Sequence, residues 1–166
     1  GRMVLHKEWA APGKIVAEAI QAVQALFRSK GLYLEVETAS DLPALFCDST
    51  RIRQVLINLL SNAGRFTERG GVRIRAWREG GDMVVSVTDT GRGIAATEKE
   101  KLFRPFQQAD GTIRERYGGS GLGLYISRSL IELHGGQLWL DSEEGKGTTI
   151  SFRLPIEPPT CLDDGA

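Results

Sequence analysis

The sequence lacks the features that mark several functional classes. Its two cysteines, Cys47 and Cys161, do not have metal-site spacing, and we interpret them as reduced thiols. The 21 basic residues are balanced by 21 acidic ones, so no positive field favours nucleic acid or an anionic membrane. No apolar run approaches the roughly 20 residues of a membrane span, and no signal peptide opens the chain. We therefore expect a cytoplasmic domain with no direct membrane or nucleic-acid contact, although its parent protein could be membrane-anchored.

The length and composition fit one folded domain. At 166 residues, with 41% hydrophobic and 25% charged residues, the chain can bury a sizeable core. Proline and polar residues dominate the carboxyl end, which is typical of a linker. We expect the folded domain over residues 12–155, with residues 1–11 as an N-terminal linker or expression remnant and residues 156–166 as a C-terminal linker.

The spacing of apolar residues predicts three main helices. Pro12 and Gly31 suit the two ends of the first helix. Asp48 or Ser49 suits the N-cap of the second, whose apolar stripe reaches Ala63. A third helix is expected from about Gly121 to His134, with one apolar face made of Leu122, Ile126, Leu130 and Leu133.

Alternating apolar residues predict the strands. A half-buried strand is expected over residues 32–37, a short one at 45–47, and hairpins over 72–87 and 138–154. Helices mixed with antiparallel hairpins indicate an α+β fold, a two-layer α/β sandwich with helices on one face of a mixed sheet. From Gly91 to Gly119 the periodicity is poor, and so long a connection is either functional or mobile.

Two carboxamides share one face of the second predicted helix. Asn58 and Asn62 are four residues apart, so their side chains stack, and Arg65 follows three residues later. This face lies about a quarter turn from the centre of the apolar stripe, where a pocket wall would be. Amide oxygens beside a cation suit Mg²⁺ and phosphate groups. The alternative is that both asparagines are solvated polar residues at a helix boundary.

A carboxylate and a glycine-rich loop follow. Asp89 continues the register of the buried strand residues before it, and a buried carboxylate needs a donor such as an adenine amino group. Gly91 and Gly93 would let the backbone approach a ligand, although Asp-x-Gly also forms tight turns. Residues 118–123 hold glycines that lead directly into a helix. Free N–H groups at a helix start bind phosphate, although a flexible loop ending in a cap is also consistent.

Taken in order, these stretches resemble a known family. Asn-x-x-x-Asn, Asp-x-Gly-x-Gly-Ile and Gly-Gly-Ser-Gly-Leu-Gly-Leu resemble the ATP-binding catalytic domain of bacterial sensor histidine kinases, in the superfamily of DNA gyrase B, MutL and heat-shock chaperone ATPases. Residues 62–67, 102–106 and 145–149 match as well, so the resemblance covers roughly residues 12–155. It implies a Bergerat-type fold with a mobile ATP lid, and ATP and Mg²⁺ as cofactors.

The resemblance implies a role for individual residues. Asn62 would be the metal ligand, with Asn58 and Arg65 near the phosphates, and these three would be the catalytic residues. Asp89 would accept from the adenine amino group, and Thr148 would lie beside the base. The other nucleotide-binding positions that it implies are Gly91, Gly93, Ile94, Phe103, Phe106, Gly119, Gly121, Leu122, Gly123 and Leu124.

Two features depart from the family pattern. Glu115 stands where many relatives have an arginine, so either Arg114 or Arg116 could contact the γ-phosphate. Neither His6 nor His134 has the context of a phosphoacceptor, which in these kinases lies on a separate helical dimerisation domain. The resemblance therefore implies the catalytic domain of a two-component protein-histidine kinase. Its partners would be that dimerisation domain and the receiver domain of a response regulator.

Other functions are less consistent with the sequence. ATP hydrolases of this superfamily carry a glutamate where the chain has Asn58, and an amide cannot act as a general base. A kinase for serine or threonine matches the lid less well. A degenerate regulatory module that binds nucleotide or a partner without transferring phosphate is a further alternative, and the intact Asn58, Asn62, Asp89 and glycine boxes argue against it.

Overall fold

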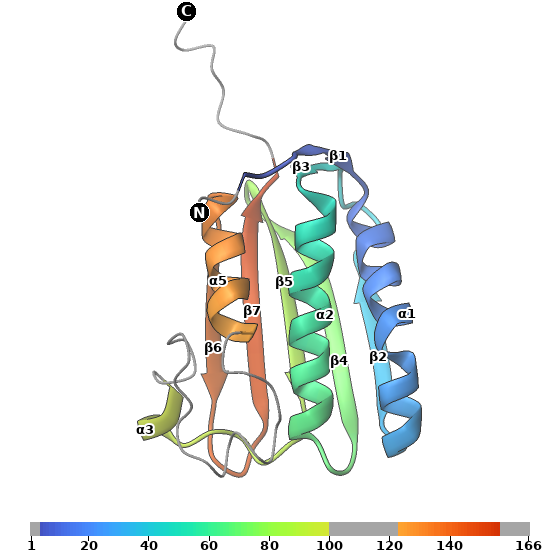
Figure 1. The fold of residues 1–166 in the computed structure, drawn as a ribbon, viewed down its shortest axis with the longest axis vertical. Coiled ribbons are helices and arrows are strands. Elements are labelled where there is room, and N and C mark those ends of the chain that lie inside the picture. The colour runs from blue at the N-terminus through green and yellow to red at the C-terminus, as the bar shows by residue number, and fades with distance from the viewer. Residues whose placement is uncertain (1–3, 100–122, 157–166) are drawn as a thin grey trace, which may run out of the picture.

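The computed structural model describes residues 4–99 and 123–156, which form two layers (Figure 1). Three helices cover one face of a five-stranded sheet: α1 (Pro12–Lys30), α2 (Ser49–Phe66) and α5 (Gly123–Leu133). The sheet order is β2-β4-β5-β7-β6, formed by β2 (Tyr33–Thr38), β4 (Gly71–Glu79), β5 (Asp82–Asp89), β7 (Thr148–Pro155) and β6 (Gln137–Ser142). This confirms the predicted two-layer α+β sandwich. The short helix α3 (Ala96–Lys99) lies beside β6.

The sheet is mixed, as predicted, and its register determines what lies next to Asp89. β5 is antiparallel to both β4 and β7, and Asp89 is opposite Val72 on one side and Thr148 on the other. β2 is parallel to β4. Side chains alternate between the two faces of a strand, so Asp89 lies on the same face as buried Val85 and Val87. That face packs against the helices.

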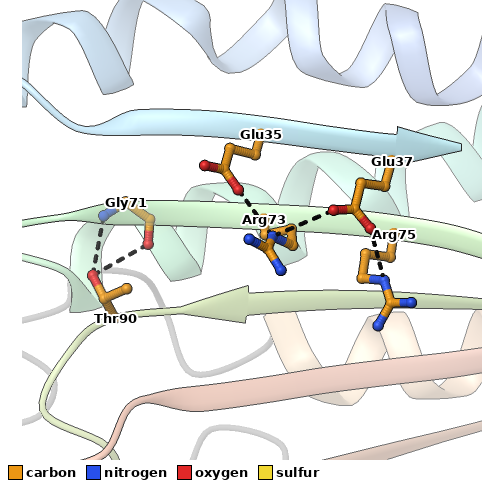
Figure 2. A network of polar contacts seen from close by, with 6 residues as sticks. All are labelled: Glu35, Glu37, Gly71, Arg73, Arg75 and Thr90. Atoms are coloured by element: carbon orange, nitrogen blue, oxygen red, sulfur yellow. Dashed lines mark hydrogen bonds and ion pairs between the residues drawn. The ribbon is translucent and has the colours of Figure 1, made fainter.

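The open face of the sheet holds a row of ion pairs at its β2 edge. Arg73 Nε lies 2.9 Å from a carboxylate oxygen of Glu35, and Arg75 Nε lies 3.1 Å from one of Glu37. Figure 2 shows how these side chains lie along β2 and β4. Solvent screens such exposed pairs, so they add little to stability. Their geometry nevertheless agrees with the parallel register, which places the two glutamates beside the two arginines.

Two buried faces differ from the predictions. On α5 the prediction was right in part: Leu130 is buried and Ile126 packs against the core, whereas Leu133 is 49% exposed and Leu122 lies outside the described residues. The buried face also includes Leu124, Ser127 and Ile131. The helix turns two small residues, Gly123 and Ser127, towards α2, which allows close approach. On β2, Val36 is 46% exposed because this strand forms the edge of the sheet.

A hydrogen-bonded group of residues ties the chain together at the end where α2 begins. The backbone N–H of Asp48 donates to Nε2 of His134 at 3.0 Å, and Nδ1 of His134 donates to the carbonyl of Leu130 at 2.7 Å. The Asp48 carboxylate caps α2 through the N–H of Arg51 and also accepts from the N–H of His6. Both ring nitrogens of His134 are thus paired in the neutral form, and burial lowers its pKa.

The N-terminal segment joins the same end of the domain. Residues 8–10, within the predicted linker, form β1 (Glu8–Ala10), which pairs with β3 (Leu45–Cys47). The aromatic rings of Trp9 and Phe46 lie across this pair with centroids 5.3 Å apart. Within the part of the chain that the structure describes, no helix is both long enough and apolar enough to cross a membrane.

We predict that acid destabilises the domain partly through His134. Its pKa is lowered in the folded state, so the unfolded chain binds the proton first, and the free energy of unfolding falls as the pH drops below about 6.5. His134→Gln should flatten this part of the profile in urea denaturation. His6→Gln, which changes an exposed side chain and keeps the backbone bond, should not. Equal acid slopes in the native domain and His134→Gln would contradict the assignment.

Candidate functional site

Asp89 is a buried carboxylate at the end of β5. It is 4% exposed, and its Oδ1 accepts from the backbone N–H groups of Gly91 at 2.8 Å and Thr148 at 3.2 Å. Burial raises its pKa to about 6, and the two N–H donors oppose this rise. Within the described part of the chain only Oδ1 is engaged, which leaves Oδ2 as an acceptor for a ligand.

The residue after Asp89 fixes the end of the strand. Thr90 Oγ1 accepts from the N–H of Gly71 at 3.0 Å and donates to the carbonyl of Arg69 at 2.9 Å. Figure 2 shows the contacts of Thr90 with Gly71, across the start of β4. The backbone that carries Asp89 is therefore held on both sides, by Thr90 towards β4 and by Thr148 towards β7.

The two glycines after Asp89 are needed for packing. A Cβ on Gly91 would lie 2.6 Å from the carbonyl oxygen of Phe66, at the end of α2. Gly93 has φ 75°, and a Cβ there would collide with the carbonyl of Glu143. These glycines let neighbouring backbone approach, which draws the loop tightly between α2 and the β6–β7 turn. Their expected place beside a ligand stays a prediction.

Ser142 joins this loop to Thr148, and the sequence did not reveal it. Its hydroxyl accepts from the N–H of Ile94 at 2.8 Å, donates to the carbonyl of Gly147 at 3.0 Å and lies 2.8 Å from Thr148 Oγ1. Ile94 and Thr148 are both buried. A serine at the end of a strand carries no local signal of such a role, because its partner Ile94 is 48 residues away.

The predicted asparagines lie where α2 packs against α5. Asn58 Nδ2 is 3.4 Å from Ser127 Oγ, and Asn62 Nδ2 is 3.8 Å from the position that a Cβ on Gly123 would take. Both asparagines are half-buried. Arg65, on the last turn of α2, is exposed. The predicted shared face is therefore present, with α5 beside it.

The site residues that the structure describes fall into two groups at one end of the domain. Asp89, Gly91, Gly93, Ile94 and Thr148 surround the carboxylate, and Asn58, Asn62 and Gly123 lie between α2 and α5. Figure 1 shows that α2 and β5 end at the same end of the domain, and that α5 begins partway along α2. Leu124 is buried in the first turn of α5. Phe103, Phe106, Arg114, Arg116, Gly119, Gly121 and Leu122 lie outside the described residues, as does most of the expected lid.

The donor chemistry between α2 and α5 suits a hydrated hard cation. Among residues 4–99 and 123–156 no group of three or more His, Cys, Asp or Glu side chains could hold a metal ion. Asn58 and Asn62 offer amide oxygens instead, and α5 begins directly opposite Asn62. Mg²⁺ accepts such oxygens while keeping several waters and binding substrate phosphates. The positive end of a helix dipole favours phosphate at the same place.

Comparison with known proteins gives a consistent result. Residues 47–158 match the family described as histidine kinase-, DNA gyrase B- and HSP90-like ATPase. The circadian input-output histidine kinase CikA of Synechococcus elongatus is 43% identical over 141 residues, which cover 80% of this chain and 19% of CikA. The chain thus spans about a fifth of that relative's length.

Solved structures are similar over almost the whole chain. The nucleotide-free catalytic domain of histidine kinase ThkA superposes with a TM-score of 0.80 at 32% identity, covering 92% of this chain and 97% of that one. Full-length ShkA in complex with AMPPNP gives 0.84 at 30% identity, covering 96% and 33%. ThkA in complex with the response regulator protein TrrA gives 0.77 at 30% identity, covering 93% and 43%.

We predict that Asp89→Asn stabilises the free domain at neutral pH. The asparagine keeps an oxygen for Gly91 and Thr148 but removes a buried charge, whose pKa rise from 3.8 to about 6 corresponds to about 3 kcal/mol. Because the folded-state pKa is raised, the cost of ionised Asp89 is full above about pH 6 and absent below about pH 4. The gain in the free energy of unfolding should follow that range.

Urea denaturation at several pH values measures this effect. Asp141→Asn, which changes an exposed carboxylate on β6, should leave the free energy of unfolding nearly unchanged at every pH. A loss of stability in Asp89→Asn at pH 7 would mean that the ionised carboxylate is not strained in the free domain.

Proposed function

Because the chain belongs to the histidine kinase-, DNA gyrase B- and HSP90-like ATPase family, and within it to the ATP-binding catalytic domains of histidine kinases, we propose that it binds Mg-ATP and donates the γ-phosphate to a histidine on a separate dimerisation domain. The observation that carries this proposal is Asp89, a buried carboxylate with one oxygen engaged by backbone and the other without a hydrogen-bond partner among residues 4–99 and 123–156. Such a group suits a ligand donor that favours its charged form.

Asp89 would bind the adenine amino group through Oδ2. The burial that raises its pKa makes the free carboxylate costly, and an N–H donor from the base would offset part of that cost. Thr148, joined to Ile94 through Ser142, would form the adjoining wall of the base site. The site would thereby select a base that carries an amino group at this position over one that carries a carbonyl.

Asn62 would bind Mg²⁺, with Asn58 and Arg65 near the phosphates. When bound, the metal would neutralise phosphate charge during transfer. Asn62 lies beside the first residue of α5, so its amide and the helix N-terminus face the same space. Arg65 is exposed and free to extend towards a ligand. The AMPPNP complex of ShkA supports a nucleotide in a domain of this fold.

The proposal includes two protein partners of the parent. The acceptor histidine would lie on a dimerisation domain, because His134 is buried with both ring nitrogens hydrogen-bonded and His6 precedes a lysine. A response regulator receiver domain would then take the phosphate. The complex of ThkA with TrrA supports that second partner.

A hydrolase of the same family is a weaker candidate. The position that would need a general base is Asn58, and its amide donates to Ser127. An amide cannot accept a proton from water at neutral pH. A module that binds nucleotide without transferring phosphate would bind ATP as a kinase does. It would differ only in leaving the dimerisation domain unlabelled in the transfer experiment described below.

We predict that Asn62→Ala abolishes the benefit of Mg²⁺ to ATP binding. The side chain is the proposed metal ligand. Removing a group that only supports a ligand already lowers metal affinity about 10-fold or more, and losing the ligand itself should cost at least as much. Calorimetry with a non-hydrolysable ATP analogue, with Mg²⁺ or with EDTA, measures it. Gln54→Ala, on an exposed position of α2, is the matched control. An undiminished metal effect in Asn62→Ala would contradict the assignment.

We predict phosphate transfer in trans. With γ-labelled ATP, the domain alone should remain unlabelled, and adding the separately made dimerisation domain of its own parent should give acid-labile label on that partner. Transfer should be slow and concentration-dependent, because tethering no longer supplies a high effective concentration. Acid-labile phosphate on His6 or His134, or an unlabelled partner despite ATP binding, would contradict the proposed kinase activity.

A further inference from the structure

Each of the two asparagines of α2 lies opposite a small residue of α5. Asp48, before the start of α2, bonds to His134, just after the end of α5, whereas Asn62 lies beside Gly123 at the start of α5. The helices are therefore antiparallel, as Figure 1 shows. Asn58 and Asn62 are one turn apart, and so are Ser127 and Gly123. Asn62 therefore faces Gly123, which has no side chain, and Asn58 faces the hydroxyl of Ser127.

The contact with Ser127 fixes the orientation of the Asn58 amide. Nδ2 of Asn58 donates to Ser127 Oγ at 3.4 Å. A hydroxyl can donate as well as accept, but when the Ser127 O–H donates to a backbone carbonyl one turn back, its oxygen can only accept from Asn58. Nitrogen and oxygen occupy opposite edges of a planar carboxamide, so Nδ2 then faces α5 and Oδ1 of Asn58 is turned away from it. Without it the amide could flip by half a turn and present donors where an acceptor is needed.

The buried position of Ser127 is energetically unfavourable for a serine. It is 0% exposed, and its neighbours on the buried stripe of α5 are Leu124, Leu130 and Ile131. A buried hydroxyl must find hydrogen-bond partners, and serine is a weaker helix former than alanine. Its hydroxyl can donate to a carbonyl one turn back, but that bond alone gives no reason to prefer serine. The contact with Asn58 supplies one.

We propose that Ser127 is a positioning residue that holds the Asn58 amide with Oδ1 towards the metal–nucleotide side. The inference rests on the proposed function and adds to it a residue outside the glycine loop and the asparagine pair. Ser127 acts through Asn58 and touches no reacting atom. Its removal should therefore matter only when Asn58 is present and only when Mg²⁺ accompanies the nucleotide.

The first test examines the free domain. In a spectrum of ¹⁵N-labelled side-chain amides, Ser127→Ala should shift the Asn58 Nδ2 resonances and speed their exchange with water, because the acceptor is lost. The Asn62 resonances should change much less. Ser151→Ala is the control, since Ser151 is equally small and 5% exposed but lies on β7 opposite Ser86, on the open face of the sheet. Unchanged Asn58 resonances in Ser127→Ala would overturn the inference.

The second test is a double-mutant cycle in nucleotide binding. Ser127→Ala should weaken binding of a non-hydrolysable ATP analogue about 3- to 10-fold with Mg²⁺ and hardly at all in EDTA. In an Asn58→Ala background the same change should have no further effect. An equal loss in both backgrounds, or an equal loss with and without Mg²⁺, would overturn the inference and leave Ser127 a structural residue.

The two proposals fail in distinguishable ways. If the native domain shows no metal-assisted binding, the proposed function fails, and the Asn58 resonances still report whether Ser127 orients the amide. If the native domain binds with Mg²⁺ and Asn62→Ala loses that benefit, the proposed function stands. A Ser127→Ala variant that then binds like the native domain would reject the positioning role alone.

Discussion

The buried Asp89 carboxylate is the constraint on which the rest of the site depends. A charge that is 4% exposed must be compensated, and here two backbone N–H groups approach one of its oxygens. Supplying those donors requires Gly91 to pass close to the end of α2 and Thr148 to sit opposite in the register of β7. Compensation stays incomplete, because burial still raises the pKa of Asp89 to about 6, and the remaining oxygen has no partner among the described residues. The free domain thus carries an electrostatic cost that the proposed ligand would relieve.

The helical layer links this end of the domain to the opposite one. α2 and α5 run antiparallel, joined at one end through Asp48 and His134 and meeting near the other at Asn62 and Gly123. The strand β1 is bonded to the Asp48–His134 end through β3. The N-terminal segment and the proposed phosphate side therefore share one pair of packed helices. Small residues on α5 let that pair approach closely enough for Ser127 to reach Asn58.

Much of this arrangement could be predicted from the sequence because its signals are local. Strand alternation placed Asp89 on the buried face, and helical spacing placed Asn58 and Asn62 together. The expected cap at Asp48 or Ser49 marked the start of α2, and the structure has it at Asp48. The buried face of α5 was predicted only in part: Leu130 is buried and Ile126 packs against the core as expected, whereas Leu133 is exposed. Buried Ser127 contacts α2 through Asn58, which the spacing of apolar residues does not report. Ser142 and the strand β1 depend on pairing between distant segments, which no local pattern reports. Predictions for residues 100–122 lie outside the residues that the structure describes.

The pKa of Asp89, followed by carboxyl ¹³C resonances in the free domain and with nucleotide, tests the central claim most directly. We expect a value near 6 in the free domain and a clear fall when an adenine nucleotide binds, because the amino group of the base donates to the charged form. Inorganic triphosphate, which lacks the base, should leave the value much closer to that of the free domain. A carboxyl group that already titrates near its ordinary value in the free domain, or one that does not respond to adenine nucleotide, would contradict the account.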